Sequence, residues 1–436
     1  MKTSTLRFAF ASVAMGASLL AFGQEQSKIV SFSVTPDGET NLSFNLGSSL
    51  AEGQTVQVDW GDGTLVSETV TLNERTTTKP TTNFYAIPKG ATVTVYGDAS
   101  TINELDASWA TGKLKIQGTD ISALTKASWI CFDSNSLTSL DASACDSVAT
   151  LQANNNALTS IKLGSATNLK SLELSNSSAT NGSNRISEFV CGTLPALTTL
   201  KMNYNYTESI DFTKMPAIVN VYAIYCSFST VDFSQSPKIA YVNVNYNNLS
   251  ELDLSMSSNV QVFATKNKLT SILIPQGNTK NIAVAENRLT FATLPYTTGT
   301  LTCNSQAAMD VTPEGNTIDL SSQLYYQGTA TKFVWANGQS NTLVEGTDYS
   351  VTDGVFTFNN NFTGLVCTMT NSHTKVKNKI TLTTNPVDIN ATAIDAIKAE
   401  AEGAAEYYNL QGIRVSNPEN GIFIKRQGGK SVKVVR

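Results

Sequence analysis

One sequence pattern of about 21 residues recurs through the middle of this 436-residue chain. Its clearest copy is YVNVNYNNLSELDLS, residues 241–255, in which Val242 and Val244 alternate with polar residues before Asn247. A second apolar segment, carrying three leucines, follows. Similar copies begin at Leu151, Leu200, Val221 and Val262. A repeat held over many copies predicts a solenoid in which each turn packs on its neighbours.

The spacing of the repeat allows its turns to be numbered. We define the repeat marker of a turn as the residue equivalent to Val242. The markers are Leu114, Ile130, Leu151, Leu172, Leu200, Val221, Val242, Val262, Ile282 and Leu301. The differences between successive marker numbers are 16, 21, 21, 28, 21, 21, 20, 20 and 19. The series predicts about ten turns, with one insertion of seven residues (28 − 21) at SSATNGSNR.

An asparagine stands five residues after most markers. The position holds Asn135, Asn156, Asn205, Cys226, Asn247, Asn267 and Asn287. The marker and the residue two later point inward, as alternating strand residues do, and the asparagine marks the end of that strand. Its carboxamide carries a donor and an acceptor, so it can pair buried backbone groups of neighbouring turns. Ser177 and Gln306 depart from the pattern, and we expect distorted turns there.

The pattern L-x-L-x-x-N/C-x-L resembles the leucine-rich repeat family. Its asparagine-rich, 21-residue form is similar to the arrays on secreted proteins of Bacteroidota, and the resemblance covers about half the chain. This resemblance implies a repeated strand face that binds proteins, with roles in protein–protein interaction or adhesion.

We predict a mainly β protein, in which a leucine-rich repeat solenoid is flanked by an N-terminal β cap and a C-terminal immunoglobulin-like β-sandwich. The expected segments are 1–23 as a signal peptide, 24–92 as the β cap, 93–309 as the solenoid, 310–390 as the sandwich, 391–406 as a linker and 407–436 as a C-terminal β segment. Trp335 and Cys367 are expected in the core of the sandwich.

Both ends of the chain carry signals of export. Lys2 and Arg7 precede an apolar run, residues 8–22, and small residues lead to Gln24, which is the plan of a cleaved signal peptide. No later stretch offers the roughly 20 apolar residues of a membrane span. Residues 407–436 resemble the sorting regions of proteins exported by the type IX route, in Y-N-x-x-G-x-x-V and G-I-F-I. A purely structural β segment is the alternative, and we expect a secreted or cell-surface protein.

The composition argues against several function classes. The chain has 30 Lys and Arg against 35 Asp and Glu, a net charge of −5, so we expect no nucleic-acid partner. Six cysteines are scattered singly and should be buried thiols rather than a disulfide framework or a zinc site. The one histidine, His373, lies in a polar turn without a nucleophile motif. We predict no catalytic activity, cofactor or metal; a hydrolase whose carboxylates meet only in the folded chain is a third hypothesis.

The stretch WGDG, residues 60–63, resembles the hairpin of polycystic-kidney-disease-type β-repeats. Asp59 and Asp62 are candidate calcium ligands, but two carboxylates fall short of the six to eight oxygen atoms that calcium takes. We therefore interpret the stretch as a tight turn.

Aromatic residues gather in the middle turns of the array. Four residues after the marker stand Tyr204, Tyr225 and Tyr246, spaced by 21 and 21. Adjacent strands lie about 4.8 Å apart, so the three rings should form a ladder. Nearby outward positions hold Ile224 and further aromatic residues. The candidate binding residues are Tyr204, Tyr222, Tyr225, Tyr241, Tyr246 and Phe263.

Two interpretations of these aromatic residues stay open. The rings either stabilise the edge of the sheet through cross-strand contacts, or form a contact patch for a partner. We predict a secreted or surface-exposed, non-enzymatic and monomeric protein that binds a protein ligand. A carbohydrate-binding surface protein that uses the tyrosine patch is the alternative.

Overall fold

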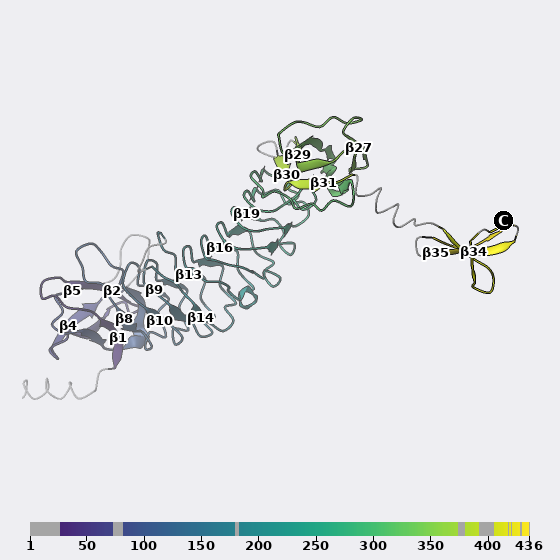
Figure 1. Cartoon of the computed structure of the whole chain (residues 1–436). Coiled ribbons are helices and arrows are strands. Elements are labelled where there is room, and N and C mark those ends of the chain that lie inside the picture. The colour runs from purple at the N-terminus through teal and green to yellow at the C-terminus, as the bar shows by residue number, and fades with distance from the viewer. Residues whose placement is uncertain are drawn as a thin grey trace, which may run out of the picture. The chain divides into compact units, whose positions relative to one another are not determined.

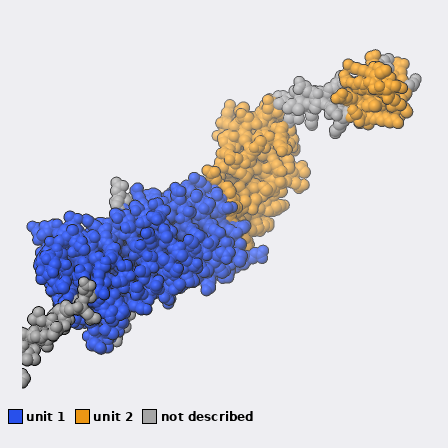
Figure 2. Space-filling view, turned by 90° about the horizontal axis from the view of Figure 1, so that it is seen from below, with its two compact units in different colours: residues 1–268, 273–281 blue, residues 269–272, 282–436 orange. Residues whose placement is uncertain are grey.

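The computed structural model describes residues 27–72, 82–178, 183–373, 380–391, 405–416, 418–419, 421–427 and 430–435. The chain forms two compact units, residues 1–268 with 273–281 and residues 269–272 with 282–436 (Figure 2). The signal peptide expected at 1–23 and most of the linker expected at 391–406 lie outside the described residues.

The first unit begins with antiparallel β-structure. Five strands form one sheet in the order β4-β3-β6-β1-β8. Their bounds are β1 Lys28–Ser33, β3 Gln54–Asp59, β4 Leu65–Val70, β6 Thr92–Tyr96 and β8 Gly118–Asp120. Val30 and Phe32 in β1, and Val56 and Val58 in β3, are buried with the period of two expected of a strand, and Ile29 and Gln57 are buried as well. Phe32 of β1 is buried against Phe44, with ring centroids 4.8 Å apart.

A second pair of strands joins the N-terminal sheet to the repeats. β2, Leu42–Ser48, pairs antiparallel with β5, Thr82–Ala86, and with β7, Ile102–Asp106. β7 is also the first strand of the parallel repeat sheet. The N-terminal strands therefore continue the hydrogen bonding at this end of the array, where an unpaired strand edge would otherwise be open.

The repeats form a β-solenoid of about nine turns with a period of about 21 residues, which confirms the predicted mainly β solenoid. Each turn contributes one short parallel strand, and these strands follow one another along the array in Figure 1. In the first unit they are β7, β9 Trp129–Cys131, β11 Thr150–Gln152, β13 Ser171–Glu173, β15 Thr199–Lys201, β16 Asn220–Tyr222, β17 Tyr241–Asn243 and β19 Gln261–Phe263.

The register of the sheet tests the repeat markers. Ile130, Leu151, Leu172, Leu200, Val221, Val242 and Val262 stand opposite one another from turn to turn. The first marker is wrong, because Leu105 rather than Leu114 pairs with Ile130. Leu114 lies in the longer connection after β7, where its N–H donates to the carbonyl of Asn41 at 3.0 Å. The unusually short first interval came from that misplaced marker.

A second row of short strands carries the second apolar segment of each repeat. These strands are β10 Ser139–Asp141, β12 Ser160–Lys162, β14 Glu188–Val190, β18 Glu251–Asp253 and β20 Ser271–Leu273. β10, β12 and β14 form a parallel sheet. The central residue of β12, Ile161, is fully buried while its neighbours face outward, so this row closes the core opposite the marker strands.

The buried asparagines connect neighbouring turns as predicted. Asn247 Nδ2 donates to the carbonyl oxygens of Ala223 at 2.8 Å and Val244 at 2.9 Å. Its Oδ1 accepts from the N–H of Phe228 at 2.9 Å. The equivalent Asn267 makes the same three kinds of bond. The carboxamides thus supply the partners that a turn inside a packed core would otherwise lack.

The seven-residue insertion keeps this ladder of asparagines. Asn184, rather than a residue at position 177, provides the carboxamide for that turn. Its Oδ1 accepts from Leu158 N at 2.9 Å, and its Nδ2 donates to the carbonyl oxygens of Ala153 and Leu174 at 2.9 and 3.0 Å. The expected break in the ladder at Ser177 is therefore absent, because the insertion carries its own asparagine into the core.

Two other positions replace the asparagine with a different side chain. Gln306 Oε1 accepts from Leu289 N at 2.8 Å and its Nε2 donates to Val284 O at 2.8 Å, so the longer amide keeps the ladder where distortion was expected. Cys226 Sγ donates to Met202 O at 3.0 Å. A thiol is a weak donor and a weak acceptor, so the ladder is weakest at Cys226.

From residue 282 onward the second unit holds two parallel strands, β21 Ile282–Ala283 and β22 Leu301–Thr302. Antiparallel sheets follow. Their strands are β23 Thr317–Asp319, β24 Tyr325–Tyr326, β25 Thr329–Ala330, β26 Lys332–Ala336, β27 Tyr349–Thr352, β28 Val355–Phe358, β29 Phe362–Asn371, β30 Ile380–Thr383 and β31 Val387–Ile389. Trp335 and Cys367 are opposite each other in the β26–β29 pair and fully buried, as predicted.

The described residues from 405 onward form a four-stranded antiparallel sheet in the order β33-β32-β34-β35. The strands are β32 Glu406–Tyr408, β33 Arg414–Val415, β34 Ile422–Gln427 and β35 Lys430–Val435. The described chain also holds three short 3-10 helices, η1 Ala99–Thr101, η2 Phe212–Lys214 and η3 Ser321–Gln323. In the described ranges, no helix has the length and apolar character to cross a bilayer.

Candidate functional site

After each marker strand the chain turns at a residue with a left-handed backbone conformation, four positions after the marker. The backbone φ lies between 52° and 63° at Ser134, Asn155, Tyr204, Tyr225, Tyr246, Lys266, Glu286 and Ser305. For a residue with a Cβ this conformation costs about 1–2 kcal/mol. Asparagine tolerates the conformation best among non-glycine residues, and serine serves in two other turns. The turn itself therefore does not call for tyrosine, yet three successive turns carry one.

The three tyrosines at this position form a stack along one edge of the sheet. The ring centroids of Tyr204 and Tyr225 are 5.1 Å apart with 16° between the planes, and those of Tyr225 and Tyr246 are 4.2 Å apart at 20°. The Nζ atom of Lys266, from the next turn, lies 4.8 Å from the centroid of Tyr246. We call these four residues the edge stack. Both ring faces of Tyr225 and Tyr246 are covered within it.

The other three predicted residues form a second group on the outward face of the same strands. Tyr222 and Tyr241 have ring centroids 4.8 Å apart at 32°, and Tyr241 and Phe263 are 5.6 Å apart at 46°. We call Tyr222, Tyr241 and Phe263 the strand-face cluster. All three are half-buried, and their rings are tilted rather than stacked. The six predicted residues thus come together in two groups on adjacent turns.

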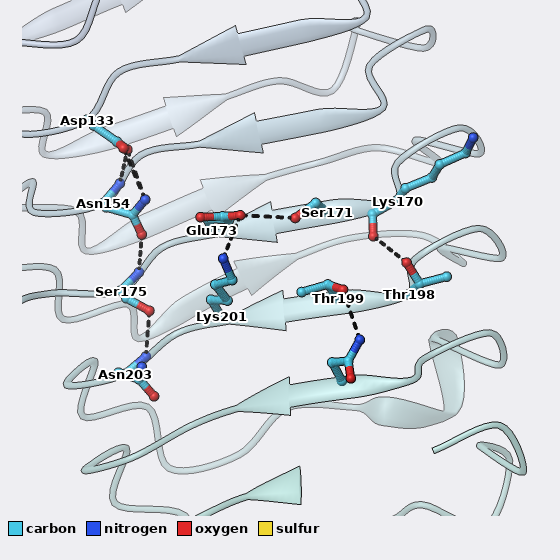
Figure 3. A network of polar contacts seen from close by, with 11 residues as sticks. Asp133, Asn154, Lys170, Ser171, Glu173, Ser175, Thr198, Thr199, Lys201 and Asn203 are labelled. Atoms are coloured by element: carbon cyan, nitrogen blue, oxygen red, sulfur yellow. Dashed lines mark hydrogen bonds and ion pairs between the residues drawn. The ribbon is translucent and has the colours of Figure 1, made fainter. Parts of the chain in front are cut away.

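A row of polar side chains, three residues after the marker of each turn, runs along the turns that precede the aromatic ones, as Figure 3 shows. Asp133 Oδ1 accepts from Asn154 N at 2.7 Å, Asn154 Oδ1 from Ser175 N at 2.8 Å, and Ser175 Oγ from Asn203 N at 3.1 Å. Each side chain therefore fixes the backbone of the next turn. We call this the polar row.

Ile224 interrupts the polar row in the middle of the aromatic region. Its N–H still donates to Asn203 Oδ1 at 2.9 Å. An isoleucine side chain cannot accept in turn, and Asn245 N donates to Asn243 Oδ1 at 3.4 Å instead. One turn later the row resumes, since Thr265 N donates to Asn245 Oδ1 at 2.7 Å. The half-buried Ile224 side chain lies in the sequence between Tyr222 and Tyr225 and adds an apolar surface there.

Charged side chains in and beside the polar row belong to the earlier turns. Burial raises the pKa of the Asp133 carboxyl above its ordinary value, although hydrogen bonds from Asn154 act in the opposite direction. Glu173 forms an ion pair with Lys201, whose Nζ lies 3.0 Å from Oε1. Glu173 also accepts from Ser171 at 3.3 Å, as Figure 3 shows. These carboxylates are engaged within the sheet, and the described residues contain no cluster of three or more metal-ligating side chains.

The WGDG stretch is a turn whose carboxylates bind its own backbone. Asp59 Oδ1 accepts from the N–H groups of Gly61 and Gly63 at 2.8 and 3.0 Å. Asp62 accepts from Thr64 N at 2.9 Å and from Lys89 Nζ at 2.6 Å. Gly61 has φ of +105°, and a Cβ there would meet the backbone of another residue at 2.5 Å. The geometry agrees with the tight-turn interpretation, and glycine is required by both conformation and space.

His373 and the cysteines are placed as buried or packed groups. The His373 ring meets the Tyr326 ring edge-on, with centroids 5.4 Å apart, and its backbone N–H donates to Asn371 Oδ1. None of the six cysteines forms a disulfide; five are buried and Cys191 is partly buried. Burial raises the pKa of Cys226 and Cys367 to about 12. A thiol with so high a pKa carries almost no thiolate at neutral pH and is a poor nucleophile.

The sequence predicted the two groups of aromatic residues, but two neighbouring features were missed, Lys266 and the polar row. Lys266 continues the tyrosine series, because it occupies the equivalent position of the turn after Tyr246, and a cation there packs on the ring. The polar row was also missed, although Asp133, Asn154 and Asn203 recur three residues after their markers. That recurrence is visible in the sequence. Its meaning needed the distances, since an outward polar residue is ordinarily solvated.

Comparison with known proteins gives similarity in fold only. No protein-family model and no curated protein sequence matches the chain. A search of solved structures finds the functional domain of InlJ from Listeria monocytogenes, which includes a cysteine ladder, at 14% identity and a TM-score of 0.34, covering 64% of this chain and 80% of that one.

The same search finds two further repeat domains. The leucine-rich repeat domain of APL1B is 16% identical with a TM-score of 0.35, covering 53% of this chain and 65% of that one. The APL1 leucine-rich repeat domain is 19% identical with a TM-score of 0.27, covering 43% and 58%. Such low scores carry no argument about function. The repeat and its strand register show a parallel β-solenoid with a period of about 21 residues.

Proposed function

We propose that this protein binds another protein through the edge stack, Ile224 and the strand-face cluster. The observation that carries the proposal is that two departures from the solenoid's own requirements coincide. In three successive turns tyrosine occupies a left-handed position that serine, asparagine, lysine and glutamate fill elsewhere. Isoleucine occupies a place in the polar row, in which side-chain oxygens from Asp133 to Asn203 accept the backbone N–H of the next turn. Local departures that reduce stability are expected at functional sites.

A purely structural role explains these departures less well. Each stacked ring pair contributes about 0.5–1.5 kcal/mol, which offsets the cost of the left-handed tyrosines. Stacking gives no reason for Ile224, which forfeits a hydrogen bond to Asn245 and is only half-buried. An apolar side chain among partly exposed rings is instead expected where a partner covers it, because contact surfaces are rich in tyrosine and depend on excluding water.

The ring geometry favours a protein over a carbohydrate at the edge stack. A sugar packs its apolar face on an open aromatic face, but both faces of Tyr225 and Tyr246 are covered by neighbours. What remains exposed on these two rings is the edge and the hydroxyl group. Phenol edges with adjacent isoleucine suit the mixed apolar and polar surface of a protein.

The carbohydrate hypothesis keeps one observation in its favour. Rings of the strand-face cluster are tilted by 32° and 46°, so their faces are less covered than those of the edge stack. A glycan array probed with the wild-type chain and with Tyr222→Ala, Tyr241→Ala tests this alternative. Specific glycan binding that the double variant loses would favour the carbohydrate, and binding by neither chain would remove it.

Site-directed photocrosslinking tests the protein-binding proposal. A benzophenone amino acid is placed at position 225 of the full chain, and at exposed Thr138 as the matched control. We expect a protease-sensitive adduct from position 225, absent from position 138, that excess wild-type chain competes away and excess Tyr225→Ala chain does not. Equal adducts at both positions, or an adduct sensitive to glycosidase alone, would contradict the proposal.

We also propose that the protein is exported and acts outside the cell without catalysis. The support is sequence alone: the signal-peptide plan of residues 1–23, and the resemblance of residues 407–436 to sorting regions of Bacteroidota proteins. Amino-terminal sequencing of the mature protein should give a start near Gln24. Deletion of residues 407–436 should keep the protein inside the cell envelope, whereas unchanged release would leave that segment a structural sheet.

A further inference from the structure

Two kinds of hydrogen bond join neighbouring turns of the solenoid just beyond the marker strands. In the asparagine ladder, the side-chain oxygen accepts from the N–H seven residues after the preceding marker, as Asn156 does from Leu137 at 3.0 Å. In a backbone bond beside it, the N–H six residues after a marker donates to the carbonyl oxygen of that same preceding residue, as Ala157 does at 2.9 Å. The backbone bond recurs at Asn248, Lys268 and Arg288, at 2.7, 2.9 and 2.9 Å.

Among the described residues, neither bond forms where the turn of Leu200 meets the turn of Val221. Cys226 stands in the ladder there, and the N–H groups of Thr207 and Ser227 make neither of the two bonds. Six residues after the marker, only Tyr206 and Ser227 in the described chain have a left-handed φ, 58° and 65°. The chain therefore leaves the marker strand by a different path in these two turns.

The contact with the preceding turn is also weakened. Asn205 is fully buried, and within the described chain its Oδ1 atom has no hydrogen-bond partner. Thr207 Oγ1 donates to the carbonyl oxygen of Ile186 at 2.6 Å in place of the usual backbone donor. Lys214 adds two bonds farther along the coil, one through its carbonyl oxygen at 2.8 Å and one through Nζ at 3.2 Å. The contact between the turns of Leu200 and Val221 is therefore the weaker of the two.

The second row of strands is interrupted at the same place. Its first sheet ends at β14, and the described chain forms no second-row strand in the two following turns before β18. Phe189, the central residue of β14, is half-buried, whereas Ile161 of β12 is fully buried. A hollow of about 170 Å³ lies beside β14, lined by Ser187, Phe189 and Cys191 and, from the next turn, by Thr207, Ser209 and Asp211.

Apolar packing and the marker sheet hold these turns together. Phe212 is fully buried, and its ring centroid lies 6.4 Å from that of Phe228 and 4.7 Å from that of Phe233. The marker strands β15, β16 and β17 remain paired throughout. Burial of apolar surface is non-directional, so it keeps two turns in contact without fixing their separation as hydrogen bonds do. One side of these turns is thus fixed by strand pairing, and the other mainly by packing.

We infer that residues 205–211 and 226–232 form a joint, at which the solenoid opens locally on its second-row side while the marker sheet stays paired. Local openings concentrate where directional bonds are few, because they need less free energy than global unfolding. The joint does not depend on the proposed function. Tyr204, Ile224 and Tyr225 belong to the same two turns, so opening of the joint also displaces part of the proposed binding surface.

Labelling of thiols in the folded, full chain tests the joint. Cys145, Cys226 and Cys303 are all buried, and burial raises the pKa of each thiol to about 12. Each thiol therefore reacts with N-ethylmaleimide only after an opening, and peptide mass mapping gives the three rates from one sample. We expect Cys226 to react at least about tenfold faster than the other two.

Urea distinguishes a local opening from global unfolding. A local opening exposes little surface, so the Cys226 rate should change less than about twofold up to about 1 M urea. The Cys145 rate should rise more steeply, because it follows a larger unfolding. Equal rates for Cys226 and Cys145, or an equally steep rise of both with urea, would overturn the inference.

A matched variant separates the joint from the loss of a single asparagine. Asn156→Cys makes the Cys226 replacement in an earlier turn, where the backbone bonds of Ala157 and Thr159 and the pairing of β10 with β12 remain. We expect the thiol at position 156 to react at least about fivefold more slowly than Cys226 in the same chain. Equal rates at the two positions would assign the opening to the thiol alone and exclude the joint. If the variant does not fold, the wild-type rates still decide the question.

Discussion

The side-chain oxygen of Asn203 accepts a hydrogen bond from the backbone N–H of Ile224 at 2.9 Å, but the Ile224 side chain has no acceptor for the backbone of the following turn. In every other described pair of the polar row from Asp133 to Asn203, a side-chain oxygen bonds the next backbone N–H. The missing acceptor leaves Asn245 N to a 3.4 Å bond with Asn243 of its own turn. Stability and surface chemistry therefore make opposite demands on position 224.

Replacing Ile224 with asparagine should raise stability and weaken partner binding. The variant Ile224→Asn regains an acceptor for Asn245 N, so we expect the free energy of unfolding to rise by about 1 kcal/mol in urea denaturation. The same change should weaken partner binding, because it removes an apolar contact. The control Asn203→Ile makes the reverse change one turn earlier and should lose about 1 kcal/mol. A less stable Ile224→Asn would show that the isoleucine is there for packing.

Cys226 is the weakest position of the buried asparagine ladder. Cys226→Asn restores a full carboxamide, with Nδ2 able to donate to Met202 O, where Sγ now lies at 3.0 Å. We expect Cys226→Asn to be at least as stable as wild type, and Cys226→Ala to lose about 1–2 kcal/mol through the lost contact and hydrogen bond. Thermal melts of the three chains check the order. If alanine proved the most stable, the bond to Met202 would have no net value.

The insertion should tolerate change except at Asn184. Asn184→Ala removes three hydrogen bonds in the fully buried core of the array and leaves backbone groups of Leu158 and Ala153 without that partner. We expect a loss of about 3 kcal/mol, since each buried unsatisfied group costs about 1–3 kcal/mol. The matched control is Asn248→Ala, at an exposed position, which should change stability by less than about 0.5 kcal/mol. Similar losses in both would count against a ladder role for Asn184.

Asp133 should make stability fall as pH rises. Its folded pKa is raised by burial, so the folded state holds the proton at pH values where the unfolded chain, with a pKa of about 3.9, has lost it. The loss of stability caused by ionised Asp133 therefore begins above about pH 4 and is complete once the pH exceeds the folded pKa. Asp133→Asn keeps an acceptor for Asn154 and should melt higher than wild type at pH 7, with the two converging near about pH 3.5.

The control for the Asp133 prediction is Asp141, whose pKa is shifted in the opposite direction. The side-chain and backbone hydrogen bonds from Ser143 lower the pKa of Asp141, so its contribution is present above the unfolded pKa and is lost as pH falls through the folded one. Asp141→Asn should therefore melt slightly lower than wild type at pH 7 and match it in acid. Melting curves that shift in the same direction for both variants would contradict the assigned pKa directions.

The sequence by itself determined the solenoid. A regular repeat period with alternating apolar positions predicts stacked turns. Each turn needs its neighbours to bury its core, and the asparagine at the strand end must pair with the next turn. The same period placed Tyr204, Tyr225 and Tyr246 in one column. The spacing of residues along the chain is enough to predict both the solenoid and the tyrosine column, because each turn repeats the same strand and the same turn conformation.

Only the tertiary structure decided where the repeat begins, how the insertion is accommodated and what the tyrosine column presents. Leu105 displaced Leu114 because strand pairing with Ile130 depends on hydrogen bonds that no spacing rule contains. Asn184 entered the ladder because its carboxamide reaches the vacant backbone groups in space, not at a fixed offset in sequence. Whether the rings show faces or edges depends on their interplanar angles, which arise from side-chain packing between turns.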